Sequence, residues 1–272
     1  MKNQLFILLI SLIALFFSCK NEDIINTPEL ISTQASQDHL FAESAFNDVA
    51  IIIEEAFQDN GMKKSCPQYN IINSDTSNID TLVIDFGDEC WNNGKLRNGR
   101  IILTYNGKYR DPLTLITITF DNYHVYSNLI YADEMKITNH GQNNQENIWY
   151  TIEVKNARLA TDNGTIDWES NISKELIHGE ETYFDLEDDV YKIFGEASGI
   201  AVNNSHFSVE IIDTLYLDLG CKIIGGVCPI RKGTSQVSIN NYDPRMIHYG
   251  DSICDCNVDV NINGVIYPLV ID

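Results

Sequence analysis

The sequence predicts a mainly β protein with one amphipathic helix near its N-terminus, and three observations support this fold class. Apolar residues recur at three- and four-residue intervals in an early segment, residues 38–60. Later segments change to a period of two and are rich in β-branched and aromatic residues. Asn-Gly pairs recur among those later segments, and such pairs supply the positive φ angles that tight hairpins need.

The helix is predicted from a spaced apolar set that ends before Gly61, a suitable C-terminal cap. Its members are Leu40, Phe41, Ala45, Phe46, Val49, Ile52, Ile53, Ala56 and Phe57. The residues that follow, 61–272, are predicted to form a single β domain.

Strands are predicted at residues 81–86, 101–105, 113–120 and 258–262, with Asn-Gly turns at 93–94, 98–99, 106–107, 163–164 and 263–264. Around Asn163-Gly164, residues 165–177 are expected to return against residues 150–161. The result is an antiparallel meander of about a dozen strands. Because strongly twisted sheets rarely stay open beyond about ten strands, we expect a sandwich or a curled open barrel.

A two-fold internal repeat is a further hypothesis. The segment Ile84–Cys90 followed by Asn98-Gly99 matches the segment Ile247–Cys254 followed by Asn263-Gly264. Each half would contain a strand that closes through an aromatic-Gly-Asp turn. The alternative is that Gly-Asp before cysteine is common turn chemistry.

The N-terminus has the pattern of a secretory signal peptide, residues 1–18. Lys2 supplies a positive charge, an apolar run follows from Leu5 to Phe17, and the small Ser18 precedes Cys19. The pattern resembles a bacterial lipoprotein signal, which implies lipid attachment at Cys19; ordinary secretion is the alternative. Residues 19–37 then form the anchor and a flexible tether, and Lys20 to Asp23 resemble a signal for the outer face of the outer membrane.

The formal net charge of −21 opposes nucleic-acid binding, since affinity for phosphate backbones comes largely from Lys and Arg. The same charge opposes direct binding to an anionic membrane, so the lipid would have to supply the attachment.

Six cysteines remain beyond Cys19, and an exported chain favours their pairing as disulfides. We expect Cys66 to pair with Cys90, and Cys221 and Cys228 to pair with Cys254 and Cys256 in an order that the residues leave open. The Cys254-x-Cys256 spacing differs from that of zinc or redox motifs, so no metal or other cofactor is expected.

The segment Tyr109-Arg110-Asp111-Pro112, the turn Phe120-Asp121-Asn122-Tyr123 and the aromatic-Gly-Asp-x-Cys pattern resemble a family of Bacteroidota outer-membrane lipoproteins without an assigned activity. The resemblance extends over most of residues 66–270 and implies a β-rich fold and an outer-membrane location. Cys228 and Cys256 look like additions to the family's cysteines, which implies a second bridge beside Cys221–Cys254.

Four tyrosines, Tyr105, Tyr109, Tyr123 and Tyr126, are candidates for contact with a glycan, although packing between strands is the more common use of such residues.

We expect Arg110 to order its own turn, and the acids Asp185 and Glu187 to Asp189 to form a solvated turn rather than a calcium site. Asp80-Thr81, Asp213-Thr214 and Asp251-Ser252 resemble O-glycosylation acceptors. The six histidines are scattered, with no zinc spacing.

No hydrolase elbow, phosphate loop or dinucleotide fingerprint is present in the sequence. No catalytic residue is therefore assigned. The leading hypothesis is a non-enzymatic, lipid-anchored outer-membrane protein that acts in surface interaction, with a surface protein or glycan as partner, or in envelope structure. The alternatives are a glycan-binding accessory protein of a nutrient-uptake system and a hydrolase with a carboxylate pair.

Overall fold

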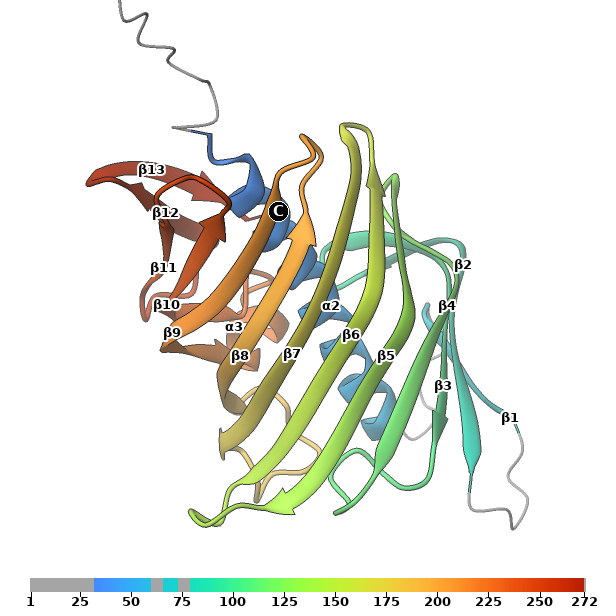
Figure 1. Ribbon diagram of the computed structural model, residues 1–272. Coiled ribbons are helices and arrows are strands. Elements are labelled where there is room, and N and C mark those ends of the chain that lie inside the picture. Colours follow the sequence, from blue (N-terminus) through green and yellow to red (C-terminus); the bar gives the residue numbers. More distant parts are fainter. Residues whose placement is uncertain (1–31, 60–65, 73–78, 272) are drawn as a thin grey trace, which may run out of the picture. The chain divides into compact units, whose positions relative to one another are not determined.

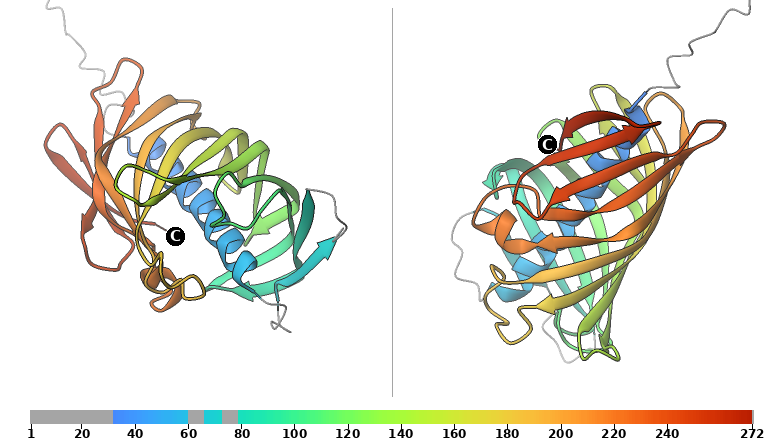
Figure 2. Two further views of the ribbon diagram at one scale, coloured as in Figure 1. Left: turned by 90° about the horizontal axis from the view of Figure 1, so that it is seen from below. Right: turned by 90° about the vertical axis from the view of Figure 1, so that its left-hand side faces the viewer.

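A computed structural model describes residues 32–59, 66–72 and 79–271. The signal sequence, Cys19, most of the tether and Gly61 lie outside the described residues. Within them, thirteen antiparallel strands form one open sheet, and every strand pairs with its neighbours in the sequence. The sheet curls around a single long helix, α2 (Gln34–Gln58), as Figures 1 and 2 show. The predicted antiparallel meander is confirmed in its curled, open form.

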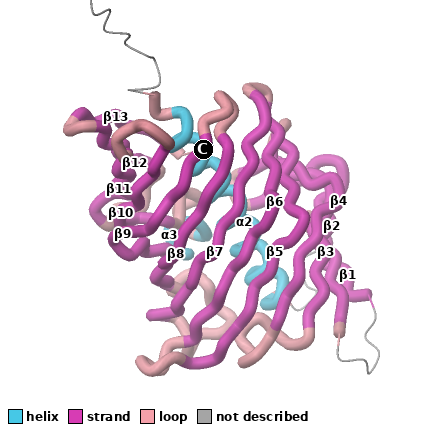
Figure 3. Tube along the Cα trace, in the orientation of Figure 1, coloured by secondary structure: helices cyan, strands magenta, loops and turns pink. Residues whose placement is uncertain are grey.

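The strands are β1 (Gln68–Ile72), β2 (Asp80–Asn92), β3 (Lys95–Tyr105), β4 (Leu115–Val125), β5 (Asn128–Gln142), β6 (Ile148–Thr161), β7 (Gly164–His178), β8 (Val190–Ile200), β9 (His206–Asp218), β10 (Ile230–Ile239), β11 (Arg245–Asp251), β12 (Asn257–Ile262) and β13 (Val265–Val270). A short helix, α3 (Leu219–Ile223), connects β9 to β10. Most other connections are short turns at the two ends of the strands (Figure 3).

Helix α2 begins four residues before the predicted start and ends two residues before the predicted end. Its last turn is closed by Asp59, whose N–H donates to the carbonyl of Glu55. The predicted apolar set packs into the concave face of the sheet, where Phe46 stacks on Trp168 with ring centroids 5.2 Å apart. At the C-terminal end of the helix, Phe57 meets Tyr105 edge to face at 4.9 Å. One hydrophobic core therefore joins the helix to the sheet.

The hairpin predicted around Asn163-Gly164 is confirmed, because Tyr150 pairs with Lys174 and Thr161 with Gly164. The predicted strand at 113–120 begins two residues late, since Leu113 takes a left-handed φ of 65° in the preceding turn.

The prediction of an Asn-Gly turn at residues 98–99 is wrong. Gly99 lies inside β3, opposite Gly87 of β2, and the chain reverses instead at Asn93-Gly94. A Cβ on Gly99 would lie 2.0 Å from the backbone oxygen of Asn122, so glycine is required there for the close approach of β4 rather than for a turn.

The two segments of the proposed repeat share only their first part. Ile84 and Phe86 are buried on β2, and Ile247 and Tyr249 are buried on β11, each pair followed by a glycine with positive φ. The second parts differ, because Asn98-Gly99 lies within a strand whereas residues 263–264 form the β12–β13 turn. The strand, turn and strand equivalence that the repeat requires is therefore absent from these segments.

The disulfides join the expected cysteines and decide which partner each of Cys221 and Cys228 takes. Cys66 pairs with Cys90, Cys221 with Cys254 and Cys228 with Cys256. The first bridge ties the segment before β1 to β2, and the other two tie the α3 region to the β11–β12 connection. The pairing that the family resemblance implied is thus the one found.

The helix core supports a first prediction. Ile52 is 0% exposed, so Ile52→Ala should destabilise the fold by about 2–5 kcal/mol through lost burial and a residual cavity. The matched control is Ile71→Ala on β1, where the side chain is 65% exposed and the expected change is within about 0.5 kcal/mol. Urea unfolding followed by circular dichroism measures both. Equal effects of the two substitutions would contradict the central role of α2.

Candidate functional site

Two buried charge clusters connect α2 to the sheet. In the first, Glu54 of α2 lies 3.2 Å from the ammonium of Lys174 on β7 and 3.7 Å from the guanidinium of Arg110. Arg110 also pairs with Asp189, and Tyr191 donates a hydrogen bond to Glu54. All of these side chains are buried, so each charge depends on its partners for stabilisation.

This cluster corrects two predictions. Arg110 was expected to order its own turn, yet it donates to the carbonyl of Gly179 and pairs with Asp189, far along the chain. Asp189 was expected in a solvated turn, yet it is fully buried. The acids before it do remain near the surface, and Asp188 accepts a bond from Thr182 at 2.8 Å.

The predicted glycan-contact tyrosines do not form one exposed platform. Tyr109 and Tyr123 are buried in the core, which excludes them from contact with a glycan. Tyr105 is half-buried against Phe57, whereas Tyr126 is 47% exposed and lies at the turn after β4. Successive side chains of a strand point to opposite faces. Tyr123 packs against Phe86 and Phe120 in the sheet, and Tyr109 packs against Phe57 of α2.

Two of the three predicted O-glycosylation acceptors, Thr81 and Thr214, are half-buried on strands, whereas Ser252 is exposed in the loop after β11. The structure thus favours a strand-forming role for the two threonines and leaves Ser252 accessible.

A pocket of about 190 Å³ lies over the side of α2 that the sheet leaves uncovered. We call it the seam pocket, since it fills the gap between the two ends of the curled sheet. The β2–β3 turn and Tyr126 line one side, and the segment after α3 lines the other. Its lining residues are Leu40, Glu43, Ser44, Asn47, Asp48, Ile51, Asn93, Gly94, Lys95, Tyr126, Lys222, Gly226, Val227, Cys228, Pro229, Ile230, Cys256 and Ile271.

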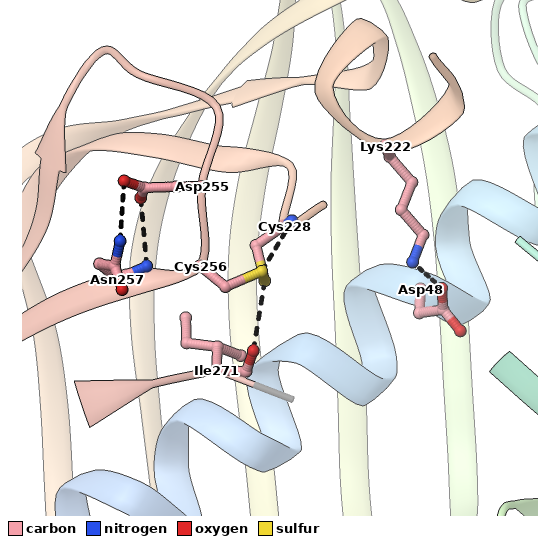
Figure 4. Close-up of a disulfide and its surroundings, with 7 residues drawn as sticks. All are labelled: Asp48, Lys222, Cys228, Asp255, Cys256, Asn257 and Ile271. Atoms are coloured by element: carbon pink, nitrogen blue, oxygen red, sulfur yellow. Dashed lines mark hydrogen bonds and ion pairs between the residues drawn. A yellow bond between two sulfur atoms is a disulfide. The ribbon is translucent and has the colours of Figure 1, made fainter. Parts of the chain in front are cut away.

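A disulfide holds the C-terminal wall of the seam pocket. Cys228 and Cys256 both line it, and Figure 4 shows their bridge beside the carbonyl oxygen of Ile271. The N–H of Ile271 also donates to the carbonyl of Cys256 at 2.9 Å. The bridge and this hydrogen bond connect three segments that are distant in the sequence. These three segments of the wall are therefore held to one another.

Asp48 and Lys222, which form the charged floor of the seam pocket, belong to the second buried charge cluster. Asp48 of α2 lies 2.5 Å from the guanidinium of Arg97 on β3 and 3.4 Å from the ammonium of Lys222 on α3. Figure 4 shows Lys222 extending from α3 towards Asp48. Burial alone would raise the pKa of Asp48, but the charges of Arg97, Lys222 and Lys95 hold that pKa below its usual value. Asp48 is therefore ionised and shared between two buried cations.

Glu43 lines the same pocket, but its pKa is raised whereas that of Asp48 is lowered. Burial raises its pKa to about 7, although the hydrogen bond that it accepts from Tyr249, at 2.8 Å, acts in the opposite direction. Its neighbour His39, 3.8 Å away, is buried, and burial lowers the pKa of its imidazole to about 3. His39 accepts a hydrogen bond from the indole N–H of Trp168.

The sequence analysis missed Glu43, Asp48, Arg97 and Lys222 as site residues. Acidic residues between the apolar positions of a helix normally belong to its solvent-exposed face. Single basic residues on strands form no recognisable motif. The available signal was the near-continuous apolar character of residues 49–53, which indicates a helix buried on more than one side.

Comparison of the chain with protein-family models, with curated proteins and with solved structures found no match. In the part of the chain that the structure describes, no helix is long and apolar enough to cross a membrane. Among the same residues, no group of three or more His, Cys, Asp or Glu side chains could hold a metal ion.

The raised pKa of Glu43 generates a second prediction. Between about pH 4.5 and 7 the unfolded chain releases this proton while the folded chain retains it, so stability falls as the pH rises through that window. Relative to Glu43→Gln, the wild type should lose about 2–3 kcal/mol of unfolding free energy between pH 4 and pH 8. Chemical denaturation of both proteins across this range measures the difference.

Because Glu43→Gln retains His39 and every other titrating group, their contributions cancel in the comparison. Parallel pH profiles for the two proteins would contradict a buried carboxyl with a raised pKa.

Proposed function

We propose that the protein is a lipid-anchored envelope protein that acts without catalysis, by binding a small ligand in the seam pocket. The observation that carries this proposal is the pocket itself, enclosed between α2, the β2–β3 turn and a wall held by the Cys228–Cys256 bridge. Apolar side chains dominate its lining and a few charged groups converge on its floor, as is usual for ligand sites.

The arrangement of charges favours binding over hydrolysis. A carboxylate-pair mechanism requires two acids on either side of a substrate, separated by roughly 5–10 Å. In the first charge cluster, Glu54 and Asp189 share Arg110, but both are buried and engaged by cations. Asp48 in the pocket is likewise engaged by Arg97 and Lys222.

Glycan binding is a second candidate, favoured by two exposed rings, of which Tyr126 lines the pocket and Trp91 contacts Tyr126. Trp91 is 64% exposed, and its ring lies edge to face with that of Tyr126 at 6.4 Å. Each ring offers a face to a sugar. Saccharides therefore belong in any ligand panel for this protein.

The location rests on the residues around Cys19, which lie outside the described residues. Cys19→Ala should abolish incorporation of labelled palmitate into the protein expressed in its natural host and release it from the membrane fraction. Ser18→Ala, which preserves a small residue before the cysteine, should retain the label. Persistent labelling of Cys19→Ala would refute the anchor.

Ligand binding is tested on the full chain with a panel of ring-sized compounds and monosaccharides. Line broadening of the compounds' NMR signals detects binding. We expect saturable binding of at least one compound to the wild type and its loss in Ser44→Trp, which fills the pocket from α2. Ser208→Trp, on an exposed position of β9, should bind as the wild type does. Absence of any binder, or binding that Ser44→Trp leaves unchanged, would overturn the proposed function.

A further inference from the structure

The seam pocket borders a buried cluster, Arg97, Lys222 and Asp48, in which basic side chains outnumber acidic ones, in a strongly acidic protein. Arg97 and Lys222 both pair with the carboxylate of Asp48, and Lys95 also acts on it. Asp48, Lys95 and Lys222 line the pocket, whereas Arg97 is fully buried and is not part of its lining. The chain as a whole has a formal net charge of −21. The floor of the pocket is therefore a local exception, whose charge a bound monoanion would balance.

Lys222 is placed to receive such an anion. Its side chain is 7% exposed, it lines the pocket, and its ion pair with Asp48 spans 3.4 Å. An ammonium group has three donors, and buried charges are stabilised only when they are paired and hydrogen-bonded. Arg97 contacts Oδ2 of Asp48 at 2.5 Å, whereas Lys222 contacts Oδ1, so Asp48 remains paired if Lys222 donates one of its hydrogen bonds to a ligand.

Glu43 does not cancel this charge. Its carboxyl also lines the pocket, but burial raises its pKa to about 7 and Tyr249 donates to it. At neutral pH it carries only part of a negative charge. An incoming anion therefore meets less repulsion than a normal glutamate would produce.

The size and walls of the pocket limit the rest of the ligand. A cavity of about 150 Å³ holds benzene, so the pocket, at about 190 Å³, fits one ring-sized group with a small substituent. Apolar side chains surround that space from three elements, namely Leu40 and Ile51 of α2, Val227 to Ile230 after α3, and Ile271. A highly hydroxylated body would lose hydration against these walls.

We propose that the seam pocket binds a small organic monocarboxylate, with its carboxylate on Lys222 and its ring-sized apolar body between α2 and the Cys228–Cys256 wall. This inference rests on the proposed function and specifies the chemistry of its ligand. A monocarboxylate is preferred over a phosphate dianion because Arg97, Lys222 and Asp48 together have one more cation than anion, and Lys95 has an interaction of its own, so a dianion would add a buried charge without a partner.

The test measures the binding of benzoate and of its neutral isostere benzamide to the full chain by calorimetry and NMR. Benzoate should bind at least tenfold more tightly than benzamide. Lys222→Met, which keeps the apolar stem and removes the charge, should weaken benzoate at least tenfold and leave benzamide unchanged. Lys155→Met, an exposed lysine on β6 paired with Glu134, is the matched control and should have no effect.

The possible failures are distinguishable. If benzamide binds as tightly as benzoate in the wild type, or if folded Lys222→Met binds benzoate normally, the carboxylate assignment is overturned and the proposed binding function survives. If neither compound nor any panel member binds in a manner that Ser44→Trp abolishes, the proposed function itself fails. Should Lys222→Met not fold, the benzoate-to-benzamide ratio in the wild type, with Ser44→Trp as the pocket control, decides the question.

Discussion

The burial of a charged helix against one curved sheet is the constraint on which the rest of this structure depends. Helix α2 fills the concave face, so its side chains lose water on several sides, and Asp48 and Glu54 are among them. A buried carboxylate without a counter-charge would be strongly destabilising. The sheet supplies those charges from β3 and β7, through Arg97 and Lys174, and Arg110 adds a third from the β3–β4 connection.

These ion pairs also determine the rotation and position of α2 on the sheet. An apolar face alone would tolerate rotation or sliding of α2 along the sheet, because Phe, Ile and Val contacts are nearly interchangeable. Pairing Asp48 with Arg97 and Glu54 with Lys174 fixes two points of the helix, about a turn and a half apart, to two different strands. We therefore interpret the charged pairs as the source of a unique docking geometry, and the apolar core as the source of stability.

The seam pocket is a consequence of the same arrangement. The sheet remains open around the helix, which leaves one side of α2 without a strand over it. Two of the three disulfides lie on that side, where they hold the α3 region against the β11–β12 connection. The part of the helix that the sheet cannot cover is thus enclosed by covalently fixed segments, and the charges that dock the helix also form the floor of the pocket.

The sequence by itself determined the features that depend on local periodicity and spacing. The helix and the strands around Asn163-Gly164 follow from short-range patterns, because φ preferences and side-chain alternation act between near neighbours. The even number of cysteines beyond Cys19 predicted disulfides, but the residues left the order of two of the three bridges open. Only the tertiary structure decided which face of each strand meets the helix, and so placed Tyr109 and Tyr123 in the core. It also paired Arg110 with Asp189, moved Gly99 from a turn into a strand, and brought Asp48, Arg97 and Lys222 together. Those outcomes depend on contacts between segments that are 12 to 174 residues apart, and no local pattern specifies them.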